Sequence, residues 1–342
     1  MKFEFHLNQN LPKLSWAISF SKKTQIIDVY HGSNVEIEEN CFFEGAWDGE
    51  FSEYLFEDST FFVGTGCKIL GNDPEQKLLV VTPNHVLEKV LVYRTADETF
   101  YASNSLAFLL AISHQELDTN YTQYESDFSS ILNGINSYTS KINLCEGYCE
   151  QYFYCNLEIS STLYIEVKPK REIESFVDYS DYYKRITSML ALLGANVSSK
   201  DRNFPYGLVT TISSGYDAPA CAALAKMIGC DTSVSFNKPE KYESDSGAEI
   251  ATVIGYKNII HHSALEYLKN DNLVEAEFCA SGELGTGIVF QAFEKDFSSN
   301  LVFFGERGDK IWSNSWDDVN DEFRFSNEKL AGISFTENRL SV

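Results

Sequence analysis

The chain has 342 residues, of which 44% are hydrophobic, and carries a formal net charge of −23. It is longer than the roughly 250–300 residues at which one hydrophobic core stops growing, so we expect two domains. The excess of acidic residues argues against a nucleic-acid partner, because neutralising phosphates requires clustered Lys and Arg.

The sequence also argues against secretion and membrane insertion. No apolar run approaches the roughly 18 residues that a membrane span needs, and residues 1–6 lack the apolar region of a signal peptide. The eight cysteines are scattered, and Cys145, Cys149 and Cys155 do not have the spacing of a zinc site. We therefore expect a cytoplasmic protein with reduced cysteines that binds neither membrane nor nucleic acid.

Residues 1–170 are rich in short segments of aromatic and β-branched residues, separated by Gly, Asn and Asp. The expected strands are 14–20, 25–30, 61–62, 78–81, 89–93, 99–102, 152–154 and 163–167. This pattern predicts a first domain, 1–170, of stacked antiparallel sheets.

The second predicted domain, 171–342, begins with a helix. Asp178 can cap a helix that runs to about Gly194, since Tyr182, Ile186 and Leu193 recur at helical spacing. From residue 206, strands and helices alternate, which predicts a parallel sheet with helices on both faces. The expected strands are 208–212, 232–236, 258–261 and 301–304, and the expected helices are 217–228, 244–254 and 286–297.

A loop of small residues follows the strand at 208–212. Ser213, Ser214 and Gly215 allow backbone N–H groups to approach a ligand, and the following helix adds partial positive charge, so an anionic phosphate is the expected occupant. Asp217 is suited to hold a divalent metal that bridges to such phosphates. Taken alone, the loop is equally well explained as an ordinary strand-to-helix turn.

The strand at 301–304 opens into a second such turn, Gly305-Glu306-Arg307-Gly308-Asp309-Lys310. Ligands of parallel sheets bind beyond the carboxyl ends of the strands. We therefore expect Asp217 and Asp309 to converge at that edge.

Together, these two turns resemble those of the asparagine synthetase family, whose synthetase domain carries an S-G-G-x-D-S loop and a later G-E-G-x-D-E turn. The strand at 233–236, the helix after Asp245 and the pair His261-His262 stand where the family has its intervening elements. Residues 78–111 resemble part of the family's N-terminal domain. The resemblance implies a glutaminase-like (Ntn-like) α+β domain followed by an α/β ATP-pyrophosphatase (PP-loop) domain.

The resemblance also implies a chemistry. Family members use ATP and Mg²⁺ to adenylate a carboxylate with release of pyrophosphate, and an amine then attacks the acyl-adenylate to form an amide. On this basis the metal ligands are Asp217 and Asp309, and the nucleotide contacts are Ser213, Ser214, Gly215, Asp217, Phe236 (at the adenine) and Gly305. The implied catalytic residues are Lys310, as an electrostatic partner of the phosphates, and Glu275 or Glu277, near the amine.

The chain departs from the family pattern at several places. Ser214 replaces a Gly and Ala218 a phosphate-binding Ser, while Arg307 and Lys310 replace a Gly and an acidic residue. Met1 stands where the family's glutaminase has its nucleophilic cysteine, so the amine is not expected to come from glutamine hydrolysis in this chain.

The chain ends at Val342, before the point where the family continues into a helical section that completes the acceptor site. We expect that a partner protein completes this site, that a smaller reaction is catalysed, or that activity is lost.

Three functions remain open at this stage. The first is an ATP-dependent ligase that acts on a small-molecule or peptide carboxylate in specialised peptide or natural-product modification. The second is a non-catalytic relative that binds a partner, and the third is another PP-loop enzyme, such as a nucleotide hydrolase. A homodimer is compatible with each.

Overall fold

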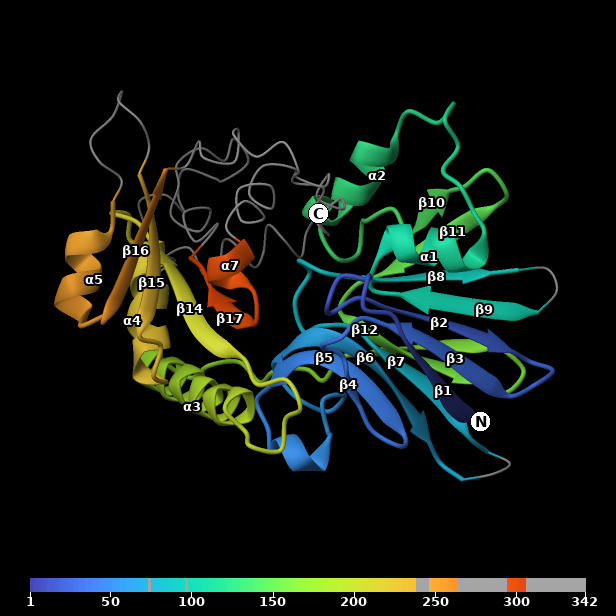
Figure 1. Cartoon of the computed structure of the whole chain (residues 1–342), viewed down its shortest axis with the longest axis horizontal. Helices are drawn as coiled ribbons and strands as arrows, with labels where there is room; N and C mark the ends of the chain where they lie inside the picture. Colours follow the sequence, from blue (N-terminus) through green and yellow to red (C-terminus); the bar gives the residue numbers. More distant parts are fainter. Residues whose placement is uncertain (73–74, 96–97, 238–245, 264–293, 306–342) are drawn as a thin grey trace. The chain divides into compact units, whose positions relative to one another are not determined.

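The computed structural model describes residues 1–72, 75–95, 98–237, 246–263 and 294–305 (Figure 1). Contacts divide these residues into two compact units, the first covering Met1–Pro205 and the second beginning at Tyr206. The division falls 35 residues later than the boundary expected from the sequence at 170/171, because the long helix after residue 178 and the segment that follows it group with the first unit.

The first unit contains a seven-stranded sheet in which, among the described residues, β1 and β3 pair in parallel and the other neighbours are antiparallel. Its strands, in spatial order, are β1 (Lys2–Leu7), β3 (Ile26–His31), β2 (Trp16–Ser21), β9 (Thr99–Ser103), β8 (Val90–Arg94), β11 (Tyr148–Tyr152) and β10 (Lys141–Asn143).

The first unit also contains a six-stranded sheet, which is antiparallel throughout. In spatial order its strands are β13 (Ile165–Pro169), β12 (Cys155–Ser160), β7 (Lys77–Val81), β6 (Phe62–Leu70), β5 (Cys41–Trp47) and β4 (Glu36–Ile37). The expectation of antiparallel sheets in the first part of the chain is therefore confirmed.

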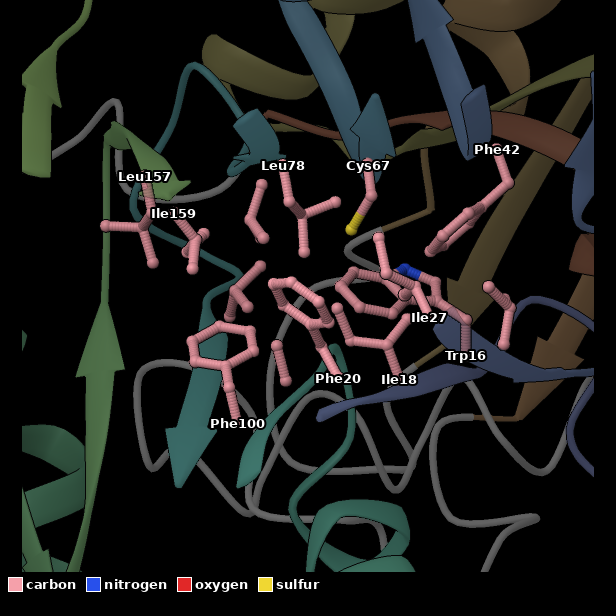
Figure 2. Packing of buried hydrophobic residues seen from close by; sticks show 14 of the residues in the cluster. Trp16, Ile18, Phe20, Ile27, Phe42, Cys67, Leu78, Phe100, Leu157 and Ile159 are labelled. Atoms are coloured by element: carbon pink, nitrogen blue, oxygen red, sulfur yellow. The ribbon is translucent and has the colours of Figure 1, made fainter. Parts of the chain in front are cut away.

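The two sheets pack face to face around one hydrophobic core. Alternate residues of β12 are buried, as expected for a strand with one face on a core. Figure 2 shows residues of the six-stranded sheet opposite residues of the seven-stranded sheet: Phe42, Cys67, Leu78, Leu157 and Ile159 face Trp16, Ile18, Phe20, Ile27 and Phe100. Burying this apolar surface is the main stabilising contribution of the unit.

Further apolar clusters cover the outer faces of both sheets. Phe43, Trp47 and Phe62 of the six-stranded sheet pack with Phe51 and Phe56, which lie in or after the 3-10 helix η1 (Phe51–Glu53). On the seven-stranded sheet, a third cluster joins strand residues to α1 (Leu106–Ser113) and α2 (Tyr124–Ser129), which leads into the 3-10 helix η2 (Ser130–Asn133). No helix among the described residues is both long and apolar enough to cross a membrane.

Two local predictions for the first unit are wrong. Residues 152–154 do not form a strand, because β11 ends at Tyr152 and the chain turns at Tyr154, with φ 49°, to enter β12 in the other sheet. The run 168–172 has a proline and several charges, which predict a linker before the second domain, but Lys168 and Pro169 complete β13 and Lys170 is buried.

Helix α3 (Tyr179–Val197) begins where the sequence predicts, with the carboxylate of Asp178 accepting a hydrogen bond from the Asp181 N–H at 2.8 Å. After α3, the buried Arg202 donates to the backbone oxygen of Gly45 at 2.9 Å, and its Nη1 lies 3.8 Å from Glu36 Oε1. Glu36 also accepts hydrogen bonds from the N–H groups of Asn203 and Phe204. These bonds fix the segment after α3 to the sandwich.

The second unit contains a four-stranded sheet in which all described pairings are parallel, as predicted (Figure 1). Its strands, in spatial order, are β16 (Asn258–Ser263), β15 (Thr232–Asn237), β14 (Gly207–Ile212) and β17 (Asn300–Phe303). The described helices are α4 (Asp217–Met227), α5 (Ala248–Ile254) and α7 (Glu294–Phe297), of which α4 and α5 pack with β14 through Ile212, Ala222 and Ala251.

Candidate functional site

The first predicted loop lies at the carboxyl end of β14, an inner strand of the parallel sheet. The strand ends at the buried Ile212, Ser213 to Tyr216 form the loop, and α4 begins at Asp217. Tyr216 occupies the N-cap position without a capping hydrogen bond from its side chain, which is 95% exposed. An N-cap of this kind leaves the first-turn N–H groups of α4 without a side-chain acceptor from the cap.

The second predicted turn starts directly beside this loop. Gly305 follows β17, and a Cβ placed on it would come within 3.0 Å of the backbone of Asp217 and Ala218. Only a glycine fits there without moving one of the two segments. The ends of β14 and β17 are therefore in backbone contact at the first turn of α4.

A third segment, which the sequence did not single out, lies at the same edge. The Ser235 hydroxyl accepts a hydrogen bond from the Gly247 N–H at 3.0 Å, and Ser246 pairs with Ser213 in an isolated antiparallel bridge. Gly247 lies so close to the end of β14 that a Cβ would be 2.8 Å from the Ser213 nitrogen. In the sequence, the small residues Ser246 and Gly247 could have indicated this segment, but they fall inside the helix expected over 244–254.

Phe236 lies at the end of β15, in register with His262 of β16. Their ring centroids are 6.2 Å apart, and His262 Nε2 lies 2.7 Å from Asp296 Oδ2 of α7. Both members of this pair are largely buried, with side-chain exposures of 10% and 14%. The pair joins α7 to the sheet and holds an imidazole beside the ring that the resemblance associates with adenine.

The structure thus brings four of the predicted residues, Ser213, Gly215, Asp217 and Gly305, to one edge of the second unit. Ser214 is exposed in the same loop, and Phe236 ends the neighbouring strand. The remaining predicted site residues, Glu275, Glu277, Asp309 and Lys310, lie outside the described residues.

Among the described residues of this edge, Asp217 is the side chain with the chemistry of a magnesium ligand. No group of three His, Cys, Asp or Glu side chains converges in the part of the chain that the structure describes. Magnesium at nucleotide sites is commonly held by one or two carboxylates together with phosphate oxygens and water. Asp217, at the start of α4, supplies one such carboxylate.

A separate hollow of about 710 Å³ lies on the first unit. It is lined by the end of β8 and the β8–β9 connection, by β11 and the residues before it, and by the turn after β12; the lining includes Tyr93, Arg94, Glu98, Glu146 and Tyr148. None of the predicted site residues lines it.

The seven cysteines in the described ranges have free thiols, and Cys149 and Cys155 are buried in strands while Cys145 is exposed.

Comparison with models of known protein families and with curated proteins finds no match to this chain.

Proposed function

We propose that this protein is an ATP-dependent ligase that adenylates a carboxylate, with release of pyrophosphate, and joins it to an amine. The observation that supports the proposal is the backbone contact between Gly305 and Asp217, in which the residue after β17 meets the start of α4 at the carboxyl ends of two paired parallel strands. Such edges are where open α/β sheets bind their ligands.

The residues of this edge have chemically distinct roles in the proposal. The N–H groups around Ser213 to Gly215 and the first turn of α4 bind the β- and γ-phosphates, where donors and a positive helix end stabilise negative charge. Asp217 binds the magnesium ion that accompanies the nucleotide, and Asp309 is proposed as its second carboxylate ligand. The ion supplies neutralisation of the charge that develops on the leaving pyrophosphate.

The rest of the site is assigned on the resemblance. Phe236 contacts adenine, Lys310 faces the phosphates, and Glu275 or Glu277 orients the attacking amine. The carboxylate substrate is a small molecule or a peptide.

The test is carboxylate-dependent exchange of labelled pyrophosphate into ATP, screened over amino acids, dicarboxylates and short peptides. The proposal expects exchange with at least one class and its loss in Asp217→Asn. Asp231→Asn is the matched control, because Asp231 pairs with Lys226 and Lys257 at the other end of α4. Exchange that survives in Asp217→Asn contradicts the assignment.

A non-catalytic binding role is the second candidate, and one residue favours it. Ala218, in the first turn of α4, offers no hydroxyl where the family has a phosphate-binding Ser. Nucleotide binding without exchange or pyrophosphate release, for every carboxylate tried, would favour this role. Release of inorganic phosphate instead of pyrophosphate would favour a nucleotide hydrolase.

A further inference from the structure

The seven-stranded sheet of the first unit ends in a strand whose outer edge is open. β1 pairs with β3 on one side, and no described strand pairs with its other side (Figure 1). Of the four edge strands described in this unit, β1 is the longest, with six residues. β10 has three residues, β4 has two, and β13 has five and ends in a proline, which cannot donate a backbone hydrogen bond. A long edge strand without a proline is a template for pairing with another chain.

The backbone of β1 presents alternate residues to the open edge. The Lys2 N–H donates to the Gln25 oxygen at 3.2 Å. At the other end of the strand, the Asn8 N–H donates to the His31 oxygen at 3.0 Å. In the parallel register of Lys2 with Ile26, the even-numbered residues therefore direct their backbone groups towards β3. The N–H and C=O groups on the open side belong to Phe3, Phe5 and Leu7. Within the described ranges, none of these groups forms a hydrogen bond.

The side chains on the outer face of β1 are polar and nearly balanced in charge. Lys2, Glu4 and His6 alternate with residues that face the sandwich core, and His6 Nε2 lies 2.8 Å from Asp28 Oδ1 of β3. Neither Lys2 nor Glu4 forms an ion pair within the described part of the chain. The local charge is close to zero, although the whole chain carries −23. Two copies can therefore approach each other at this edge with little of the repulsion that the total charge imposes.

We propose that β1 is a dimerisation strand, which pairs antiparallel with β1 of a second copy around a two-fold axis at Phe5. In this register, the backbone groups of the two Phe5 residues face each other, and those of Phe3 face those of Leu7. The seven-stranded sheet continues across the axis into the sheet of the second copy. Leu7, which is 56% exposed in the single chain, gains an apolar cross-strand neighbour.

Charge complementarity selects this register. With the axis at Phe5, Glu4 lies directly opposite His6 of the second copy, and the two-fold symmetry repeats the pair. The imidazole of His6 then has one carboxylate for each nitrogen, Asp28 at Nε2 and Glu4 of the second copy at Nδ1. An axis at Glu4 would instead set two glutamates opposite each other. An axis at Phe3 would pair only the first half of the strand.

The test is sedimentation equilibrium of the full chain, with charge substitutions on β1. The proposal expects a reversible dimer of the unaltered protein. Glu4→Lys and His6→Glu each place like charges opposite each other, twice per dimer, so each should weaken dimerisation at least tenfold. An equimolar mixture of the two variants should restore it, because the introduced lysine then faces the introduced glutamate. A role of His6 within one chain, such as its contact with Asp28, would not be restored by mixing.

Glu166→Lys is the matched control. Glu166 lies on β13, the edge strand of the other sheet, with 48% of its side chain exposed. The substitution changes the net charge by the same amount as Glu4→Lys, so the dissociation constant should stay at the unaltered value. Leu7→Pro is a variant without a charge change. It removes an N–H group that β3 does not use, so it should weaken the dimer and leave the pairing of β1 with β3 in place.

Three results would overturn the proposal. The first is an unaltered protein that stays monomeric up to its highest soluble concentration. The second is a dimer that Glu4→Lys, His6→Glu and Leu7→Pro leave as stable as before, or that Glu166→Lys weakens equally. The third is a mixture of Glu4→Lys and His6→Glu that associates no more tightly than either variant alone.

Discussion

At the scale of single residues, the buried pair Arg202–Glu36 gives the sharpest stability prediction. Both side chains are almost fully buried, at 0% and 2% exposure, and the guanidinium lies 4.5 Å from the Phe51 ring centroid. Removing one partner leaves a buried charge uncompensated, which costs about 3–5 kcal/mol. We expect Arg202→Ala to lower the free energy of unfolding by this amount in urea titrations.

Arg185→Ala is the control for this prediction. Arg185 pairs with Asp181 on the surface of α3, with 36% of its side chain exposed. Exposed pairs contribute no more than about 1 kcal/mol, so the control should stay near the unaltered protein. Equal losses in both variants would mean that the buried pair does not hold the segment after α3 in place.

Gly305 is the residue that tests the geometry of the candidate site. An alanine there would collide with the backbone of Asp217 and Ala218, so Gly305→Ala should separate the two turns and weaken nucleotide binding at least tenfold, about 1.4 kcal/mol. At Gly215, a Cβ would meet only the Ser213 hydroxyl, at 3.5 Å. The thermal midpoint of Gly215→Ala should therefore be unchanged, whereas that of Gly305→Ala should fall.

The sequence predicts some of these residues and not others, for a physical reason. Local chemistry marks Ser213, Gly215 and Asp217, since small residues and an acid after an apolar strand are visible in one short window. Glu36 and Arg202, in contrast, are 166 residues apart, and nothing near either one indicates that the other neutralises it. The sequence around Glu44 likewise does not indicate that this residue is buried, because the sheet that covers it is formed by strands from other parts of the chain.

At the scale of elements, α3 shows where local signals are sufficient. Asp178 caps it as predicted, and its buried residues, among them Leu190, Leu193 and Val197, recur at helical spacing. We expect Asp178→Ala to cost about 1 kcal/mol, because the Asp181 N–H loses its acceptor, while Asp178→Asn retains most of the stability. Urea titrations measure both, and equal losses in the two variants would contradict a capping role.

Other elements depended on tertiary context. The sequence predicted alternating strands and helices in the second unit, but it began α5 at residue 244 instead of Ala248 and gave no strand for Lys2–Leu7. β1 pairs in parallel with β3, a contact that no turn between neighbouring strands specifies. The turn at Tyr154 was missed because the aromatic run 152–154 has the composition of a strand although the chain changes sheets there.

At the scale of the whole molecule, two buried groups should shape the pH dependence of stability. Burial lowers the pKa of Lys170 from 10.5 to about 7, and its amino group donates to the backbone oxygen of Thr82. Between these values the unfolded state binds the proton and the folded state does not, so stability from Lys170 rises with pH. Glu44 in β5 acts in the opposite direction: burial raises its pKa from 4.5 to about 8, so stability from this group is lost as the pH rises towards 8.

Together, the two groups predict that the free energy of unfolding has a minimum between about pH 7 and about pH 8. Lys170→Met should remove the rise above pH 7, and Glu44→Gln should remove the fall below pH 8. The measurement is the difference in urea midpoint from the unaltered protein across this range. A Lys170→Met variant whose midpoint keeps the original slope would show that Lys170 stays charged in the folded protein.

We infer that the edge formed by β14 and β17 binds a magnesium nucleotide. Calorimetric titration of Mg–ATP, and of an analogue that cannot be hydrolysed, tests it most directly, with Asp217→Asn and Asp309→Asn as variants and Asp231→Asn as control. A nucleotide site at this edge should bind with a dissociation constant in the micromolar range, about −8 kcal/mol, and this binding should be lost in both variants and kept in the control. No heat of binding at millimolar nucleotide, or equal binding by all proteins, would contradict it.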